Sequence, residues 1–149
     1  TGSELEEIAP GAYLVSNFTR TTDFEKINKR FYIYKNNEYI PDKFTDEISL
    51  VLDTEKGLVL IVGCSHPGIV NICETVKSKL GKKIYGIIGG THLVEASDEQ
   101  IDLTFKYFEE MEIELMGLSH CSGQKAVEQA RKWKGKFFQN CTGAEIILK

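Results

Sequence analysis

The fold is decided by the stretch Leu58-Val59-Leu60-Ile61-Val62-Gly63-Cys64-Ser65-His66-Pro67-Gly68. Its first five residues are all apolar, which predicts a strand that is buried on both faces. A glycine-containing loop follows, and Pro67 suits the first turn of a helix. Apolar residues at helical spacing extend this helix to Leu80, and Gly81 ends it. The stretch therefore predicts a strand, a loop and a helix in succession.

The rest of the chain repeats this alternation of strands and helices. Residues 48–52 and 58–62 flank a short loop with a glycine and predict a β-hairpin. Ser97 is placed to cap a helix, with Gln100 in the capping-box position. Strands next to helices predict parallel pairing and an α/β fold, a two-layer αβ sandwich. The further strands are expected at 11–16, 31–34 (with a turn at 36–37), 83–88, 115–118, 137–138 and 144–148, and the further helix at 123–133.

Length and composition limit the classes of protein that the chain can represent. Its 149 residues predict one domain, 1–149, with an irregular region over 1–46. The 42% of apolar and 27% of charged residues are globular values. A net charge of −4 and a pI near 5.4 argue against a nucleic-acid-binding protein. No apolar run is long enough to span a membrane, so we expect no membrane partner.

The N-terminal residues and the cysteines of the chain predict its cellular compartment. Residues 1–10 are acidic and lack the apolar segment of a signal peptide, so we expect a cytoplasmic protein with reduced thiols. Cys73 and Cys141 are expected to be buried apolar side chains. The first residue is Thr1 and not Met, so the interpretations stay open that the chain is a separate gene product, a truncation or a proteolytic fragment.

All three histidines of the chain follow a predicted strand at a similar distance. They are His66, His92 and His120, and each precedes a predicted helix. The carboxyl ends of parallel strands lie along one edge of a sheet, where ligands bind. We therefore expect the three imidazoles at one crevice, with Cys64 and Cys121 beside them. Imidazole and thiolate suit zinc and iron, so this crevice is a candidate metal site. The alternative is that each histidine only hydrogen-bonds its own turn.

Other residues offer competing interpretations. Cys64 precedes a predicted helix, whose dipole would favour a nucleophilic thiolate, although a Cys-x5-Arg loop would need arginine where Val70 stands. Asp46 and Glu47 precede a strand and are either carboxylates of the same crevice or a solvated pair. Asp23 and Glu25 are expected to be surface charges. The chain has no G-x-G-x-x-G, P-loop or G-x-S-x-G motif, which argues against the corresponding nucleotide sites and serine hydrolases.

Residues 63–71, 88–93 and 120–123 resemble signature segments of one branch of the metallo-β-lactamase superfamily. This branch comprises metal-dependent hydrolase-like proteins, including dihydropterin ribofuranosyl-aminobenzene phosphate synthases. Residues 8–13 and 22–25 and the pair Asp46–Glu47 also fit it, so the resemblance covers nearly the whole chain. It implies half of an αββα fold, because the family's N-terminal His-x-His-x-Asp-His loop has no counterpart here. The chain therefore resembles the C-terminal half of such a protein.

The resemblance also implies a metal site. His120 matches the last metal-binding histidine of the fold, and Cys64 matches the strand end that usually carries a bridging aspartate, with His66 close by. These three are the expected metal ligands. His92, Cys121, Asp46 and Glu47 are expected to support them or to contact a substrate. Zinc is the expected metal, with iron or manganese as alternatives.

The function implied is that of a metal-dependent hydrolase that activates water for a small-molecule substrate. With half of the ligands missing, we expect little or no hydrolysis by this chain alone. Half of the fold would expose an apolar sheet face, which predicts a homodimer, association with the missing half, or rearrangement into a ferredoxin-like sandwich. The alternatives are a non-catalytic module that binds metal or a small molecule or assists assembly, and a thiol enzyme that uses Cys64.

Overall fold

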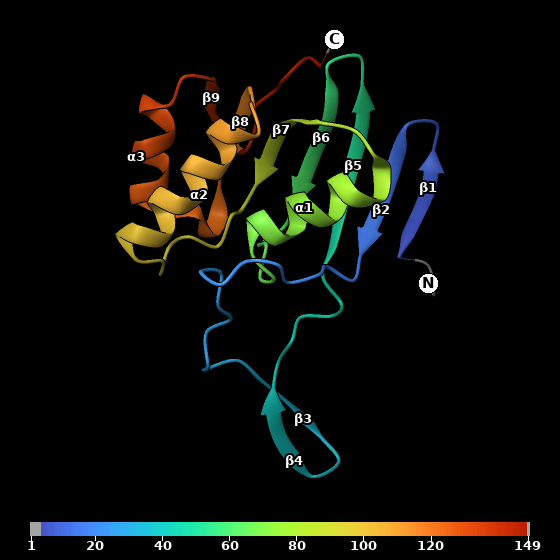
Figure 1. Ribbon diagram of the computed structural model, residues 1–149, viewed down its shortest axis with the longest axis vertical. Helices are drawn as coiled ribbons and strands as arrows, with labels where there is room; N and C mark the ends of the chain where they lie inside the picture. Colours follow the sequence, from blue (N-terminus) through green and yellow to red (C-terminus); the bar gives the residue numbers. More distant parts are fainter. Residues whose placement is uncertain (1–3, 149) are drawn as a thin grey trace.

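A computed structural model describes residues 4–148 as a seven-stranded sheet, three helices and a separate hairpin (Figure 1). The sheet has the order β1-β2-β5-β6-β7-β8-β9. Its strands are β1 Leu5–Ala9, β2 Ala12–Ser16, β5 Ile48–Thr54, β6 Gly57–Val62, β7 Ile84–Gly89, β8 Leu115–Leu118 and β9 Lys136–Gln139. The helices are α1 Ile69–Leu80, α2 Asp98–Glu110 and α3 Gln124–Lys132, and a single 3₁₀ turn spans His120–Ser122. The hairpin consists of β3 Tyr32–Lys35 and β4 Glu38–Pro41.

The four strands β6 to β9 are parallel neighbours, and each helix carries the chain to the next strand of the series. The connections from β6 to β9 all step the same way across the sheet. Because such crossovers are right-handed, all three helices lie on the same face of the sheet, as Figure 1 shows. The predicted two-layer α/β architecture is therefore confirmed. The ferredoxin-like alternative is wrong, because that topology inserts a strand between its two βαβ crossover partners.

The core lies between the helices and one face of the sheet. Leu58, Leu60 and Ile87 of the central strands and Ile72 and Phe108 of the helices are at most 1% exposed. Burying each such side chain contributes about 1.5–3 kcal/mol. The predicted cap of α2 is also confirmed, since Ser97 accepts a hydrogen bond from the backbone N–H of Gln100.

The opposite face of the sheet, here called the open face, carries a second set of apolar side chains. The strand register places Leu50 beside Ile61 and Ile61 beside Ile88 on this face. These side chains are only partly buried, and the three helices pack on the other side. The partly buried leucine and isoleucine side chains of the open face are those of Leu14, Leu50, Leu52, Ile61 and Ile88.

The N-terminal region is more ordered than the sequence analysis expects. Residues 1–46 contain four strands among the described positions. The turn at Asn36 and Asn37 is confirmed, and both residues have positive φ. The hairpin stands away from the sheet in Figure 1, and its Tyr34 and Tyr39 are 64% and 76% exposed.

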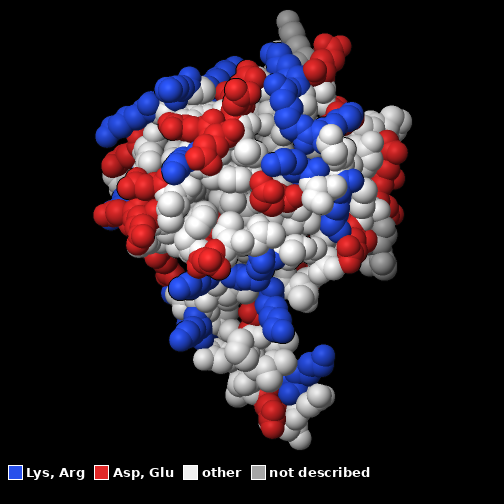
Figure 2. Space-filling view, in the orientation of Figure 1, with Lys and Arg blue, Asp and Glu red and all other residues white. Residues whose placement is uncertain are grey.

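The C-terminal strand expected at 144–148 is absent, and these residues belong to no strand or helix. Ile146, Ile147 and Leu148 line a small hollow beside Tyr85 and Leu115 instead. On the face drawn in Figure 2, acidic and basic side chains are interspersed. Within the described residues, no helix is long and apolar enough to cross a membrane.

A buried carboxylate holds the start of α1, at the end of the stretch that decides the fold. The helix begins after Gly68, which has no side chain to cap it. Glu25 does this from a distance, accepting hydrogen bonds from the N–H groups of Val70 and Asn71, both at 2.8 Å. Glu25 is 3% exposed, so the expectation of a surface charge is wrong. Burial raises the pKa of its carboxyl group, against the lowering effect of these hydrogen bonds.

The substitution Gly68→Ala is predicted to destabilise the protein by about 2–3 kcal/mol. A Cβ at this position would lie 2.3 Å from a carboxylate oxygen of Glu25, and the backbone has φ +104°. The matched control is Gly63→Ala, where a Cβ would meet no described atom within 4 Å and should change stability by less than about 0.5 kcal/mol. Urea unfolding midpoints measure both, and equal midpoints for the two variants would contradict the packing argument.

Candidate metal centre

Three loops that follow adjacent parallel strands form the candidate site. The register aligns Val62 of β6 with Gly89 of β7, and Gly89 with Leu118 of β8. The three loops therefore leave the sheet side by side. Each contains one non-glycine residue with positive φ: Ser65 at 64°, His92 at 52° and His120 at 51°. Such conformations cost about 1–3 kcal/mol each and concentrate at functional sites.

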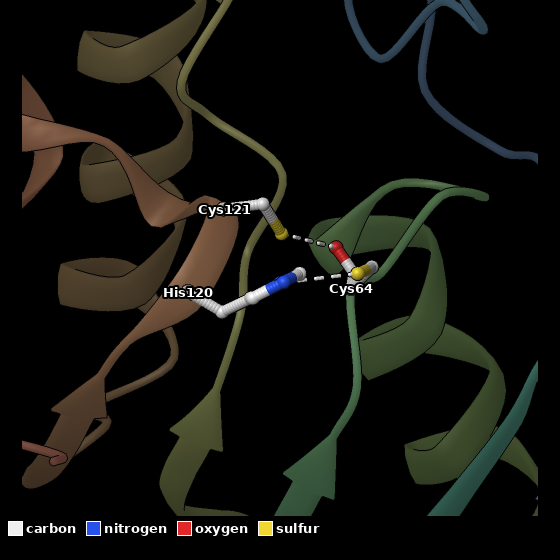
Figure 3. Close-up of side chains that lie close together, drawn as sticks. All are labelled: Cys64, His120 and Cys121. Carbon is white, nitrogen blue, oxygen red and sulfur yellow. Dashed lines mark hydrogen bonds between the residues drawn. The ribbon is translucent and has the colours of Figure 1, made fainter.

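Two thiols and one imidazole meet between the first and third loops, and we call them the thiol–imidazole cluster (Figure 3). The Sγ atom of Cys64 lies 3.3 Å from Nδ1 of His120. The thiol of Cys121 donates a hydrogen bond to the carbonyl oxygen of Cys64 at 3.4 Å. One ligand atom from each of these three residues lies within 4.8 Å of the others. Thiolate and imidazole are common zinc ligands, and this spacing would let one ion contact all three residues.

Burial and solvent access differ within the thiol–imidazole cluster. Burial raises the pKa of the Cys121 thiol to about 11, with a smaller opposing effect from the backbone N–H of His92. Near neutral pH this thiol is therefore protonated. Cys64 is half-buried and His120 is exposed, so the cluster opens to solvent.

His66 belongs to a second group, although it is only two residues from Cys64. Its Nδ1 is 2.6 Å from a carboxylate oxygen of Glu47. The other oxygen of Glu47 accepts the N–H of Ser65 at 2.9 Å. Phe44 stacks on the imidazole at 4.2 Å between ring centroids. A carboxylate that fixes one imidazole nitrogen leaves the other free to bind a metal or to exchange a proton.

His92 lies next to His66, with 4.8 Å between the ring centroids. Burial, and then the neighbouring His66, lower the pKa of His92. Its Nδ1 is buried without a hydrogen-bond partner among the described residues. The imidazole is therefore neutral near pH 7. Both histidines line a cavity of about 260 Å³, which Glu25, Lys29 and Glu95 also line.

The structure thus divides the residues singled out from the sequence into two neighbouring groups. Cys64 and His120 are together, but the third member is Cys121, and His66 lies instead with Glu47 and His92. Asp46 is exposed, whereas Glu47 contacts the site. Cys73 is buried as predicted, but the prediction of a buried Cys141 is wrong because Cys141 is exposed. Which of these residues bind metal stays a prediction.

The sequence analysis missed the aromatic residues around the second group. Phe31 and Phe44 lie at opposite ends of the hairpin segment, and their rings are 5.3 Å apart. Phe31 is 6.2 Å from both His66 and His92. Their sequence signal is weak, because isolated aromatic residues in an irregular segment carry no periodicity that relates them to a distant loop.

Comparisons with known proteins found relatives of this chain. No family model matches the chain. Over 147 residues it is 36% identical to the 7,8-dihydropterin-6-methyl-4-(beta-D-ribofuranosyl)-aminobenzene-5'-phosphate synthase of Methanocaldococcus jannaschii, covering 94% of this chain and 49% of that protein. An uncharacterized protein of the same organism is 36% identical over 105 residues, covering 70% of this chain and 38% of that protein. The chain therefore spans half or less of the length of these relatives.

A solved structure has the same fold. The crystal structure of Tm1679, a metal-dependent hydrolase of the beta-lactamase superfamily, matches with a TM-score of 0.86 and 29% sequence identity. The match covers 100% of this chain and 58% of that one. The resemblance that the loop segments suggested is therefore shown by both comparisons.

Lowering the pH is predicted to destabilise the metal-free protein more than its His92→Gln variant. Because the pKa of His92 is lowered in the folded state, the unfolded chain takes up a proton at a higher pH. This contribution to the free energy of unfolding is complete above the unfolded pKa and is lost as the pH falls towards the folded one. Urea midpoints between about pH 7.5 and about pH 5.5, with chelator present, measure the difference. Parallel pH profiles for the two proteins would refute it.

Proposed function

Because the chain belongs to the metallo-β-lactamase superfamily, we propose that it is one half of a metal-dependent hydrolase and supplies the sheet-edge part of the metal centre. The observation that carries this proposal is the meeting of three loops whose imidazoles and thiols lie within a few ångströms of one another. We assign the chain to the C-terminal half, because the His-x-His-x-Asp-His motif expected of the other half is absent from its 149 residues.

The residues present fit a divalent metal at this edge. Thiol and imidazole donors suit zinc, with iron or manganese as alternatives. When bound, such a metal supplies Lewis-acid activation of water or of a substrate oxygen. The carboxylate of Glu47 orients His66, whose second nitrogen can bind the metal or hold a proton. His92, neutral near pH 7, can hydrogen-bond a small substrate in the adjoining cavity.

We further propose that the chain alone has little or no hydrolytic activity. The superfamily centre takes ligands from both halves of the fold, and one half supplies only part of that set. The open face supports a partner, because its half-buried leucine and isoleucine side chains form a continuous apolar row across four strands. We assign the other αβ half to this face. A second copy of the chain is the alternative occupant.

A thiol enzyme is the second candidate function, and a specific contact favours it. The Sγ atom of Cys64 lies 3.3 Å from His120 Nδ1, within reach of a base that could remove its proton. If Cys64 is a nucleophile, iodoacetamide at neutral pH should label it faster than the exposed Cys141. Slower labelling of Cys64 than of Cys141 would exclude this function.

The chain is predicted to gain hydrolytic activity when a complementary half is supplied. The test mixes the chain with the part of the Methanocaldococcus jannaschii synthase that the chain does not cover, in the presence of zinc. Turnover of a chromogenic phosphodiester or a lactone should appear in the mixture, be absent from either piece alone and be abolished by chelator. Full activity of the chain alone would contradict the incomplete centre. Association without turnover would favour a non-catalytic binding or assembly module.

A charge on the open face is predicted to prevent this association. Ile61→Lys places an ammonium group in the middle of the apolar row, where docking would leave it buried and unpaired. Leu103→Lys is the matched control, since Leu103 is 37% exposed on α2, on the opposite layer. Size-exclusion chromatography with light scattering should show the complex for the control and not for Ile61→Lys. Equal behaviour of the two variants would place the partner elsewhere, and a homodimer of the chain alone would identify a second copy as the occupant.

A further inference from the structure

The hairpin of β3 and β4 exposes apolar side chains on both of its faces. The register sets Tyr34 opposite Tyr39 and Ile33 opposite Ile40. Because successive side chains of a strand point to opposite faces, the tyrosines lie on one face and the isoleucines on the other. Together with Tyr32, these side chains are each at least 37% exposed. Among the described residues, no other segment of similar length exposes as many large apolar side chains.

Nothing in the chain covers this hairpin. Figure 1 shows β3 and β4 beyond the ends of β6 and β7, with no helix against either face, and in Figure 2 they form the narrow projection at the bottom. A two-stranded hairpin on its own is at best marginally stable in water. The three tyrosines alone expose on the order of 400 Å², since an aromatic side chain presents about 150–250 Å². An apolar patch of several hundred square ångströms marks an interaction surface.

The base of the hairpin is fixed to the sheet edge. The rings of Phe31 and Phe44 lie 5.3 Å apart there, and Phe44 stacks on His66. Arg30 forms an ion pair of 2.6 Å with Glu95 of the loop between β7 and α2. The hairpin is therefore held at a defined place beside the three loops of the candidate metal centre. A surface that is already held in place loses less entropy when a partner binds.

The hairpin segment has the opposite charge to the rest of the chain. Residues 26–43 contain five basic and two acidic residues, a net charge of +3. Because the whole chain carries −4, the remaining residues carry −7. Among the described residues, four of the five cations form no ion pair, namely Lys26, Lys29, Lys35 and Lys43. Unpaired lysines around an apolar surface favour a partner surface that is acidic as well as apolar.

We propose that the hairpin is a second docking element, which binds an acidic and apolar surface of the other αβ half. This inference rests on the proposed function, in which a domain of similar size joins this chain. The other half is the favoured occupant because it has to bring its metal ligands to the sheet edge from which the hairpin projects. The open face would contact that half along the sheet, and the hairpin would contact it beyond the strand ends. Two separate contacts fix the rotation of one half against the other, which a single apolar row does not.

The experiment measures the affinity of the chain for the part of the Methanocaldococcus jannaschii synthase that the chain does not cover. Calorimetric titrations with chelator present exclude any contribution from a metal. We expect the double variant Tyr34→Ser, Tyr39→Ser to bind on the order of tenfold or more weakly. Lys35→Glu should also weaken binding, and its effect should shrink at high salt. The matched controls are Leu103→Ser on α2 and Lys134→Glu after α3, both exposed on the helix layer, which should bind as the unchanged chain does.

A second readout needs no variant. Trypsin should cut the chain alone after Lys35 and Lys43, and the complex should protect both sites, whereas cutting after the exposed Lys134 should not change. Circular dichroism establishes that every variant is folded.

The outcomes separate this inference from the proposed function. Unchanged affinity of the hairpin variants, or a complex whose hairpin is still cut, would overturn the inference and leave the two-half function standing. A homodimer of the chain that the hairpin substitutions abolish would assign the hairpin to a second copy and overturn it as well. If the two pieces do not associate at all, the proposed function fails and the inference fails with it.

Discussion

The parallel register of β6, β7 and β8 is the constraint on which the site depends. It sets the last residues of the three strands level, so that three loops distant in sequence start from one line. A shift of one residue would reverse the faces of a strand and move its loop by about 3.3 Å along the strand axis. The apolar side chains that fix this register, such as Leu60 and Ile87, are fully buried against the helices. Core packing therefore determines where the imidazoles and thiols lie.

A sharp turn within the first of these loops explains why the site consists of two groups. Cys64 and His66 come from one loop, but Ser65 between them has φ 64°, and the chain turns sharply there. The hydroxyl of Ser65 donates to the carbonyl oxygen of Gly90 at 2.7 Å, which anchors the turn to the next loop. Cys64 then lies with His120, and His66 lies with Glu47. Backbone strain of this kind is tolerated where surrounding bonds determine the conformation.

Local patterns in the sequence were enough to predict the parts of the fold that depend on local rules. The continuous apolar run of β6, the Ser97 cap and the Asn36–Asn37 turn each have a short-range signal. Contacts between segments that are distant in the sequence had no such short-range signal. Glu25 caps a helix 45 residues away, and the partition of Cys64 and His66 follows from one strained residue between them. The sequence was therefore enough to predict that the site residues lie at one sheet edge, but not which of them contact one another.

If the chain is one half of a hydrolase, as proposed, its sheet edge and its open face are incomplete in related ways. In an αββα fold the second sheet would cover the open face, and the same half would bring its ligands to the edge where the three loops end. Burial of the apolar row would supply nonspecific association energy. The sheet edge carries thiol and imidazole groups, to which the partner would add the remaining metal ligands. Docking through the row would fix the two sets of ligands relative to each other, because both sheets would pack as rigid layers. One burial event would thus both stabilise the fold and assemble the metal centre.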